Sequence, residues 1–440
     1  MIAFKTLMRA SLVLAVVLAI VSFLMGDWMW FVVNILNAAL LVLPFRRDLG
    51  YYYSREVIWL TMLAPVLMTA FFLLDLAGIP LRDVEIMDVS MFSYITAAVQ
   101  AIQTFVTGVM LALILDMTGV VRMSRAWIAL FAVAFAVSVS ALDMLFSFVD
   151  MYLNGQPVFN DDFIGNEARL TNRELMVTPF TTAVVTVFYA MALVRMGRKS
   201  HGTHLVKPDG TYAEPVEMGE PEEVPSYVDP RKWGIDDAIS LVSGLAMLGA
   251  SAWIYGNDPV SARTGLFCGV ICLIPFIVKR IGLFRLPTSV TTVICLASFL
   301  HGFGLLTKLY DTFDQWDTIT HTMSSLVVGI CVFYVLTCYQ VYSNGKVGFT
   351  SHGLAILSGL IALAFSTYWE VFEFTSDLIT GGHTQYSPYD TLTDMVCDIL
   401  GMFIATVWID LHMRKRTPGE LVASFGLNDR LKRFISKGHP

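Results

Sequence analysis

The sequence predicts an all-α, polytopic integral membrane protein with about twelve transmembrane helices, arranged as two parallel six-helix repeats. Three observations predict this fold class: the composition, the length of the apolar runs, and the similarity between the two halves of the chain. Of the 440 residues, 56% are hydrophobic and 15% are charged, whereas soluble domains carry about 25% charged residues. A chain of this composition needs a lipid bilayer around it.

Each predicted span is an apolar run of about 20 residues, the length that crosses a bilayer as a helix. We place six spans in the first half, at residues 7–25, 28–45, 56–78, 90–116, 125–149 and 177–195. Six more follow at residues 236–255, 264–279, 287–306, 318–342, 352–376 and 391–412. The first run is not followed by a small-residue cleavage site, so we interpret it as a retained span.

Basic residues concentrate in alternate loops, and this pattern predicts the orientation in the membrane. Arg46 and Arg47 follow the second predicted span, Arg198 and Lys199 follow the sixth, and residues 414–416 follow the last. The positive-inside rule then places both termini in the cytoplasm of a multi-pass protein of the plasma membrane. The net charge of -7, with no basic face, excludes nucleic acid as a partner.

The composition also divides the chain into segments. Residues 1–196 form the first six-span repeat, and residues 236–412 form the second. Residues 197–235 are rich in Pro and Glu and cannot build a packed core, so they are predicted to be a disordered cytoplasmic linker. Residues 413–440 form a basic cytoplasmic tail.

The two halves share short patterns at an offset of about 220 to 231 residues, which indicates a tandem duplication. Leu43-Pro44-Phe45 corresponds to Ile274-Pro275-Phe276. Six spans per half give both copies the same orientation, hence a parallel repeat. The first copy has a degenerate site, because its Thr96, Gln100 and Phe146 stand where the second has Asp317, His321 and Glu373.

Three consecutive spans of the second half contain acidic residues and one histidine. A charged side chain within a span costs at least ~2.5 kcal/mol, so such residues usually have a function. Helical spacing forms one stripe per span: Asp317 with His321, then Glu370, Glu373 and Asp377, then Asp390, Asp394 and Asp398. The predicted topology puts all three stripes in the outer half of the bilayer. Spans joined by short loops are usually neighbours, so we expect the stripes to converge.

Carboxylates this numerous cannot all stay ionised and unpaired in a low-dielectric site, so we favour a bound divalent cation. The expected metal ligands are Asp317, His321, Glu373, Asp390, Asp394 and Asp398. Oxygen ligands with one imidazole suit Mg²⁺, Mn²⁺, Ca²⁺ or Zn²⁺. The expected catalytic groups are His321, Glu370 and Asp394. A proton or sodium relay, and a buried hydrogen-bond network without ligand, are the alternatives.

Taken together, three motifs resemble those of the YjdF-like family of six-span membrane proteins, which is distantly similar to the VanZ-like proteins. They are Asp317-x-x-x-His321 with Gly329, Glu370-x-x-Glu373 between aromatic residues, and the series Asp390, Asp394, Asp398 and Gly401. The resemblance covers residues 311–409 well and the rest of the second half loosely. It implies a six-span fold with a polar intramembrane site, and it implies no particular reaction. The doubled chain, and Phe374 in place of a frequent Trp, depart from that family.

Three functions fit these observations. The first is a hydrolase or transferase that acts on a lipid or lipid-linked substrate at an outward-facing metal site. The second is a proton- or ion-coupled transporter built from two parallel repeats. The third is a non-catalytic membrane protein that binds a partner or serves as a scaffold. The sequence contains no nucleotide-binding or serine-hydrolase motif, and it shows no Arg-rich segment of the kind that captures phosphate tightly.

Overall fold

The computed structural model describes residues 2–46, 49–160, 162–196, 204–209, 211, 213, 232–313, 315–343, 345, 347–381, 385 and 387–437. These residues form fifteen α-helices and six strands of two residues each. The all-α fold class is therefore confirmed. The chain separates into two compact units, residues 1–217 with 363–395, and residues 218–362 with 396–440.

Among the described helices, eleven are long and apolar enough to cross a membrane. They are α1 (Ile2–Met25), α3 (Arg55–Leu76), α4 (Met91–Met117), α5 (Arg125–Leu153), α6 (Asn166–Met196), α7 (Ile235–Ile254), α8 (Pro259–Arg280), α9 (Thr288–Thr307), α11 (Gln315–Tyr342), α12 (Ser351–Thr380) and α13 (Pro388–Met413). The apolar part of α2 (Trp28–Arg46) is shorter, at Trp28–Pro44. A multi-pass membrane protein is thus confirmed, while the count of twelve spans and their repeat stay predictions.

Large apolar side chains remain exposed on these helices, as expected for surfaces in contact with lipid. Examples are Leu24 at 76% and Trp253 at 88% exposure. Short polar residues begin several helices by accepting hydrogen bonds from free backbone N–H groups. The Asp27 carboxylate accepts from Trp30 N at 3.0 Å, and Ser90 Oγ accepts from Ser93 N at 3.2 Å. These polar residues therefore mark helix starts within an otherwise apolar sequence.

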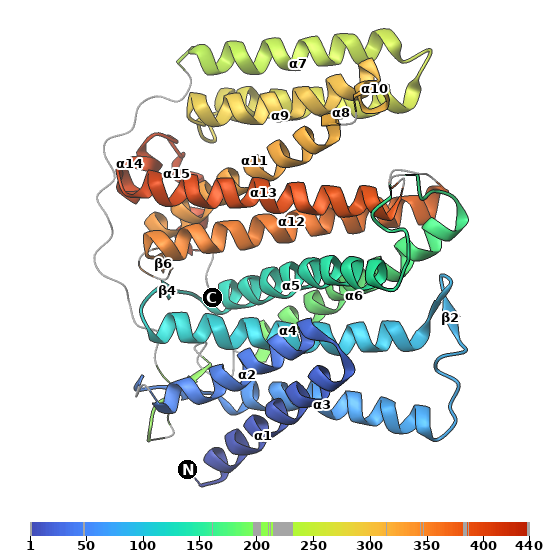
Figure 1. The fold of residues 1–440 in the computed structure, drawn as a ribbon. Coiled ribbons are helices and arrows are strands. Elements are labelled where there is room, and N and C mark those ends of the chain that lie inside the picture. Colours follow the sequence, from blue (N-terminus) through green and yellow to red (C-terminus); the bar gives the residue numbers. More distant parts are fainter. Residues whose placement is uncertain are drawn as a thin grey trace. The chain divides into compact units, whose positions relative to one another are not determined.

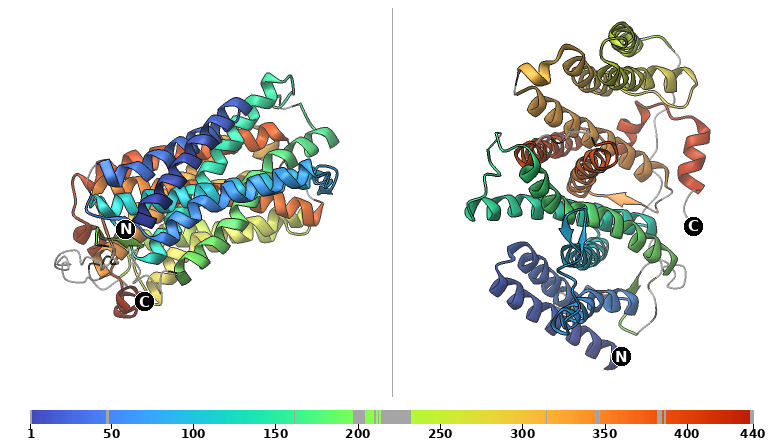
Figure 2. Two further views of the ribbon diagram at one scale, coloured as in Figure 1. Left: turned by 90° about the horizontal axis from the view of Figure 1, so that it is seen from below. Right: turned by 90° about the vertical axis from the view of Figure 1, so that its right-hand side faces the viewer.

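In the first unit, α4 packs against α5 and α6, and α5 also packs against α6 (Figures 1 and 2). Helix α4 is the most enclosed of these, with buried residues along most of its length. The second half of α12 and the start of α13 join α5 and α6 in one apolar cluster, which includes Met144, Phe148, Val371 and Met395. Segments from both ends of the chain therefore build this unit.

Part of the predicted linker at 197–235 is ordered. Strand β5 (Leu205–Val206) pairs antiparallel with β1 (Tyr52–Tyr53) of the first unit. His204 and Ala213 on either side are buried. The backbone groups of Leu205 and Val206 thus find partners in β1, and the disordered linker at 197–235 stays a prediction. Residues 214–231 of the predicted linker lie outside the described part of the chain.

In the second unit, α7, α8 and α9 pack on one another, and α11 packs against α9 and against the short helices α14 (Pro418–Ala423) and α15 (Asp429–Lys437) (Figure 1). A buried ion-pair cluster joins α7 to α8. Lys279 is 1% exposed, and its Nζ lies 2.6 Å from Asp236 Oδ2 and 2.5 Å from Asp237 Oδ2. Lys279 is therefore part of the packing of this unit.

Candidate metal centre

His321 lies between two carboxylates in the second unit. Its Nε2 is 3.6 Å from Asp317 Oδ1, and its Nδ1 is 3.5 Å from Asp398 Oδ1. The side chain of Asp317 is 33% exposed, that of His321 is 15% exposed, and that of Asp398 is 4% exposed. The site therefore runs from a partly open carboxylate at the start of α11 to a buried one within α13.

The local sequence explains this arrangement. Asp317 and His321 are one turn apart in α11, so their side chains share a helix face. Asp317 lies in the first turn, where the helix dipole favours a negative charge. Asp398 is fixed by a hydrogen bond from Ser325 Oγ at 2.5 Å, and Ser325 is one turn after His321. Ser325 was not among the residues predicted from the sequence, although its place on the Asp317–His321 stripe was a usable signal.

Two glycines allow α11 and α13 to approach closely beside these residues. A Cβ atom at Gly401 would lie 2.3 Å from the Thr322 carbonyl oxygen, and one at Gly329 would lie 2.7 Å from Ala405 Cβ. Small residues at such crossings let helix backbones come together in membranes. Gly401 is three residues after Asp398, so this close approach holds the Asp398 carboxylate against His321.

A second polar chain reaches the start of α11 from α9. The Tyr310 hydroxyl lies 2.6 Å from His301 Nδ1 and 3.1 Å from Thr320 Oγ1. Thr320 Oγ1 donates to the Asp317 carbonyl oxygen at 2.9 Å. This chain ties His301 to the backbone that carries Asp317, and it gives the His301 ring a hydrogen-bonding partner of its own.

Glu370 is a buried carboxylate of the first unit, at 1% exposure. Gln385 Nε2 donates to Glu370 Oε2 at 3.1 Å and to its carbonyl oxygen at 3.3 Å. The amide oxygen of Gln385 in turn accepts from Asn172 Nδ2 at 2.9 Å, and Asn172 Oδ1 accepts from Thr391 at 3.3 Å. This amide chain fixes the orientation of Glu370, and nothing in the sequence pattern had singled out Gln385.

The remaining predicted residues differ in their surroundings. Asp394 is 4% exposed and precedes Asp398 by one turn in α13, so both carboxylates share a helix face. Glu373 accepts a hydrogen bond from Trp369 Nε1 of its own helix at 2.9 Å. Asp390 lies in the first turn of α13, where its backbone N–H donates to Ser387 Oγ at 3.2 Å.

Within the described residues, Asp, Glu and His side chains come close enough together to hold a metal ion in two groups of three. His321 belongs to both groups, Asp317 to one and Asp398 to the other, whereas Glu373 and Asp390 belong to neither. The structure thus contains acidic and histidine groups within metal-ligand distance. The assignment of individual residues as ligands or catalytic groups stays a prediction.

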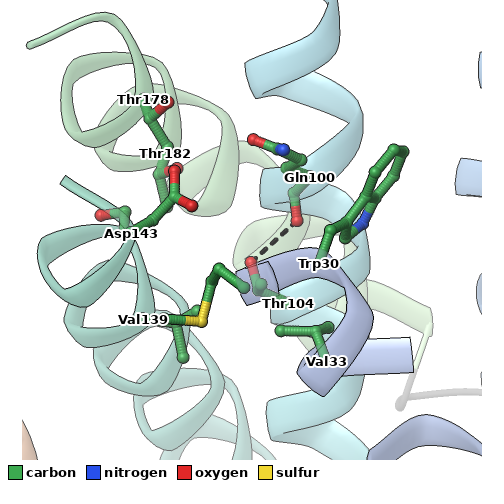
Figure 3. A pocket seen from close by; sticks show the side chains of 10 residues that line it. Trp30, Val33, Gln100, Thr104, Val139, Asp143, Thr178 and Thr182 are labelled. Carbon is green, nitrogen blue, oxygen red and sulfur yellow. Dashed lines mark hydrogen bonds between the residues drawn. The ribbon is translucent and has the colours of Figure 1, made fainter. Parts of the chain in front are cut away.

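The first half contains a small cavity where the predicted duplication would place its own site. The cavity, of about 20 Å³, is lined by Gln100, Asp143, Thr178 and Thr182 among others (Figure 3). Gln100 is the predicted counterpart of His321, and its Nε2 donates to Asp27 Oδ2 at 3.3 Å. Such a space is large enough for one water molecule. Among the described lining residues, one carboxylate thus faces amide and hydroxyl groups, and none is a histidine.

Comparison with known proteins supports a membrane family for the second half. A family model described as a predicted membrane protein (DUF2238) matches residues 238–415. No curated protein and no solved structure matches the chain. The chain is therefore similar, over this half, to a family of membrane proteins, as the motifs had indicated. The YjdF-like and VanZ-like relationships and the tandem duplication stay predictions.

Proposed function

We propose that this protein is an intramembrane metal-dependent enzyme, a hydrolase or transferase that acts on a lipid or lipid-linked substrate. The observation that carries the proposal is His321, with one ring nitrogen toward Asp317 and the other toward Asp398. Metal-binding histidines commonly place one nitrogen on the ion and the other against an orienting carboxylate. Asp317 and His321 would hold the cation, and Asp398, held by Ser325, would orient the ring.

The charges in this site also favour a cation. Asp398 is nearly inaccessible, and within the described residues neither Asp398 nor Asp317 forms an ion pair with a lysine or arginine. An uncompensated buried carboxylate is costly, by several kcal/mol. A divalent cation, Mg²⁺, Mn²⁺, Ca²⁺ or Zn²⁺, would supply the missing positive charge.

Asp394, one turn before Asp398 in α13, is kept as an expected ligand, and Glu370 as the expected acid–base group. The bound cation would polarise a substrate oxygen or activate a water molecule. Glu370 suits the acid–base role, because its carboxylate is buried and its orientation is fixed by Gln385. The positive-inside pattern supports an orientation with this site toward the outer leaflet of the plasma membrane and both termini in the cytoplasm.

Elemental analysis of the purified full-length protein tests the proposal. The wild-type protein should contain about one divalent ion per chain, and His321→Ala and Asp398→Asn should each lose it. Gln100→Ala, at the predicted counterpart of His321 in the first half, should retain the ion. Equal metal content in the His321→Ala and Gln100→Ala variants would contradict a site centred on His321.

An ion-coupled transporter is the second candidate, and the cavity of the first half favours it. Asp143 lines that cavity and forms no ion pair with a basic residue in the described part of the chain. A carboxylate of this kind suits a proton or sodium relay. Flux measurements in liposomes, with Asp394→Asn as the control, distinguish the candidates. Flux that exceeds the control would replace the enzyme proposal by the transporter.

A further inference from the structure

A larger cavity lies in the first unit, separate from the small one around Gln100. Its volume is about 150 Å³, and its lining comes from the start of α6, the end of α12 and the residues before α13. Phe374 and Leu378 form an apolar wall, whereas Arg169, Arg173 and Ser387 provide polar groups. A water molecule occupies about 30 Å³ of liquid. The cavity can therefore hold a group several times larger, such as a tetrahedral oxyanion.

The two arginines give this cavity an anion-binding character. Arg169 and Arg173 are one turn apart in α6, so both guanidinium groups lie on one helix face. Arg169 contacts Asn166 Oδ1 at 3.4 Å, and it forms no ion pair with a carboxylate in the described part of the chain. A guanidinium carries five N–H donors in a planar fork that matches phosphate oxygens. Arg169 therefore has donors available for a bound anion.

Arg173 is held in place from outside the cavity. Its Nη1 forms an ion pair with Asp88. Asp88 follows Met87 in the two-residue loop between β2 (Glu85–Ile86) and β3 (Val89–Ser90). Both loop residues have positive φ, 53° and 62°, a conformation that residues other than glycine adopt at a cost. The hairpin thus positions the Arg173 guanidinium and occupies only part of its donor set.

The same cavity is connected to the proposed acid–base group. Gln385 lines the cavity, and its amide donates to Glu370 Oε2. The backbone N–H of Gln385 donates to Asp377 Oδ2 at 3.0 Å, and Asp377 is the one acidic residue among the described residues of the lining. A group bound by the arginines would therefore lie in the cavity that Gln385 joins to Glu370.

We propose that this cavity binds the phosphate group of the substrate, with Arg169 and Arg173 as its donors. This inference rests on the proposed function and names its substrate class. The bound group is either the phosphate of a lipid, whose chain would pass along Phe374 and Leu378, or free inorganic phosphate. The sequence contains no Arg-rich segment, which argued against tight phosphate binding. In the structure, however, a single helical turn of α6 supplies both arginines.

Calorimetric titration of the full-length protein in a non-ionic detergent tests the proposal. The probes are dioctanoyl phosphatidate, dioctanoyl glycerol with the same chains and no phosphate, and inorganic phosphate. Phosphatidate should bind and dioctanoyl glycerol should not. Arg169→Gln should weaken phosphatidate binding about tenfold or more, because each charge-assisted hydrogen bond contributes at least that factor. Arg263→Gln, which changes an exposed arginine of the second unit, is the matched control.

Tighter binding of phosphatidate than of inorganic phosphate would identify a lipid source, and equal binding would identify free phosphate. Equal affinity of wild type and Arg169→Gln, or equal binding of dioctanoyl glycerol and phosphatidate, would overturn the inference. Measuring the metal content of the same preparations distinguishes a failure of this inference from a failure of the proposed function. Arg169→Gln should keep its metal, whereas phosphate binding by a wild-type protein without metal would contradict the enzyme proposal alone.

Discussion

The close approach of α11 and α13 at Gly401 offers the sharpest test of the metal centre. In Gly401→Ala, the added Cβ would lie 2.3 Å from the Thr322 carbonyl oxygen and 3.0 Å from Ser325 Cβ. The nearest obstacle is backbone, so it cannot rotate away. Ordinary contacts need about 3.4 Å, and relief therefore requires a local shift of about 1 Å, with an overpacking cost of roughly 1–3 kcal/mol.

A shift of this size would displace Asp398 and so tilt the His321 ring, and metal sites tolerate ligand displacements of only about 0.2 Å. Gly401→Ala should therefore lower metal affinity at least about tenfold, since a displacement of about 1 Å at a reacting site can cost up to 100-fold. Competition with a fluorescent chelator would measure this affinity. Gly249→Ala is the matched control, because it is also a helical glycine of the second unit and a Cβ there meets nothing within 4 Å. Unchanged affinity in Gly401→Ala would refute the reasoning.

Two further predictions concern residues outside the metal centre. Lys279→Met leaves two buried aspartates without their lysine, and it should destabilise the protein by about 3–5 kcal/mol, whereas Lys308→Met removes an exposed ion pair and should cost at most about 1 kcal/mol. Thermal unfolding in detergent compares the two variants, and equal losses would contradict the buried role of Lys279. Burial lowers the pKa of His204 from 6.5 to about 4. His204 therefore stays neutral in the folded protein while the unfolded chain takes up a proton, so stability is complete above pH 6.5 and falls by up to about 3 kcal/mol as the pH drops toward 4. Hydrogen exchange at β1 and β5 should quicken over this interval in the wild type and less so in His204→Gln, and a pH-independent wild type would disprove this account.

Sequence reasoning located the polar residues of the site because charge is rare in apolar spans. Asp317 and His321 were placed on one helix face from their spacing alone, and the structure brings Asp398 to them. Helical periodicity is local, so it can be read from the chain. The same periodicity predicted Glu373 as a metal ligand. Its carboxylate accepts a hydrogen bond from Trp369 of its own helix, and its role as a ligand stays a prediction.

What spacing could not predict are the partners contributed by distant segments. Gln385 on Glu370 and Asn172 on Gln385 join polar groups that no short pattern links. Ser325 lies on the predicted stripe, but its contact with Asp398 of another helix does not follow from that spacing. Lys279 reads as a charge at a span end in the sequence, whereas its ammonium group is enclosed by two aspartates of another helix. Such contacts depend on which side chains face each other after the helices pack.

The amino-acid sequence by itself determined the membrane environment, the helical class and the stretch that holds the unusual charges, because hydropathy and helical period are properties of consecutive residues. Only the tertiary structure decided that a pair of arginines in α6 lines a cavity with Gln385, and that Gly401 lets a buried aspartate reach His321. The physical reason is distance along the chain, because side chains that are far apart in sequence interact only after packing has brought them into contact.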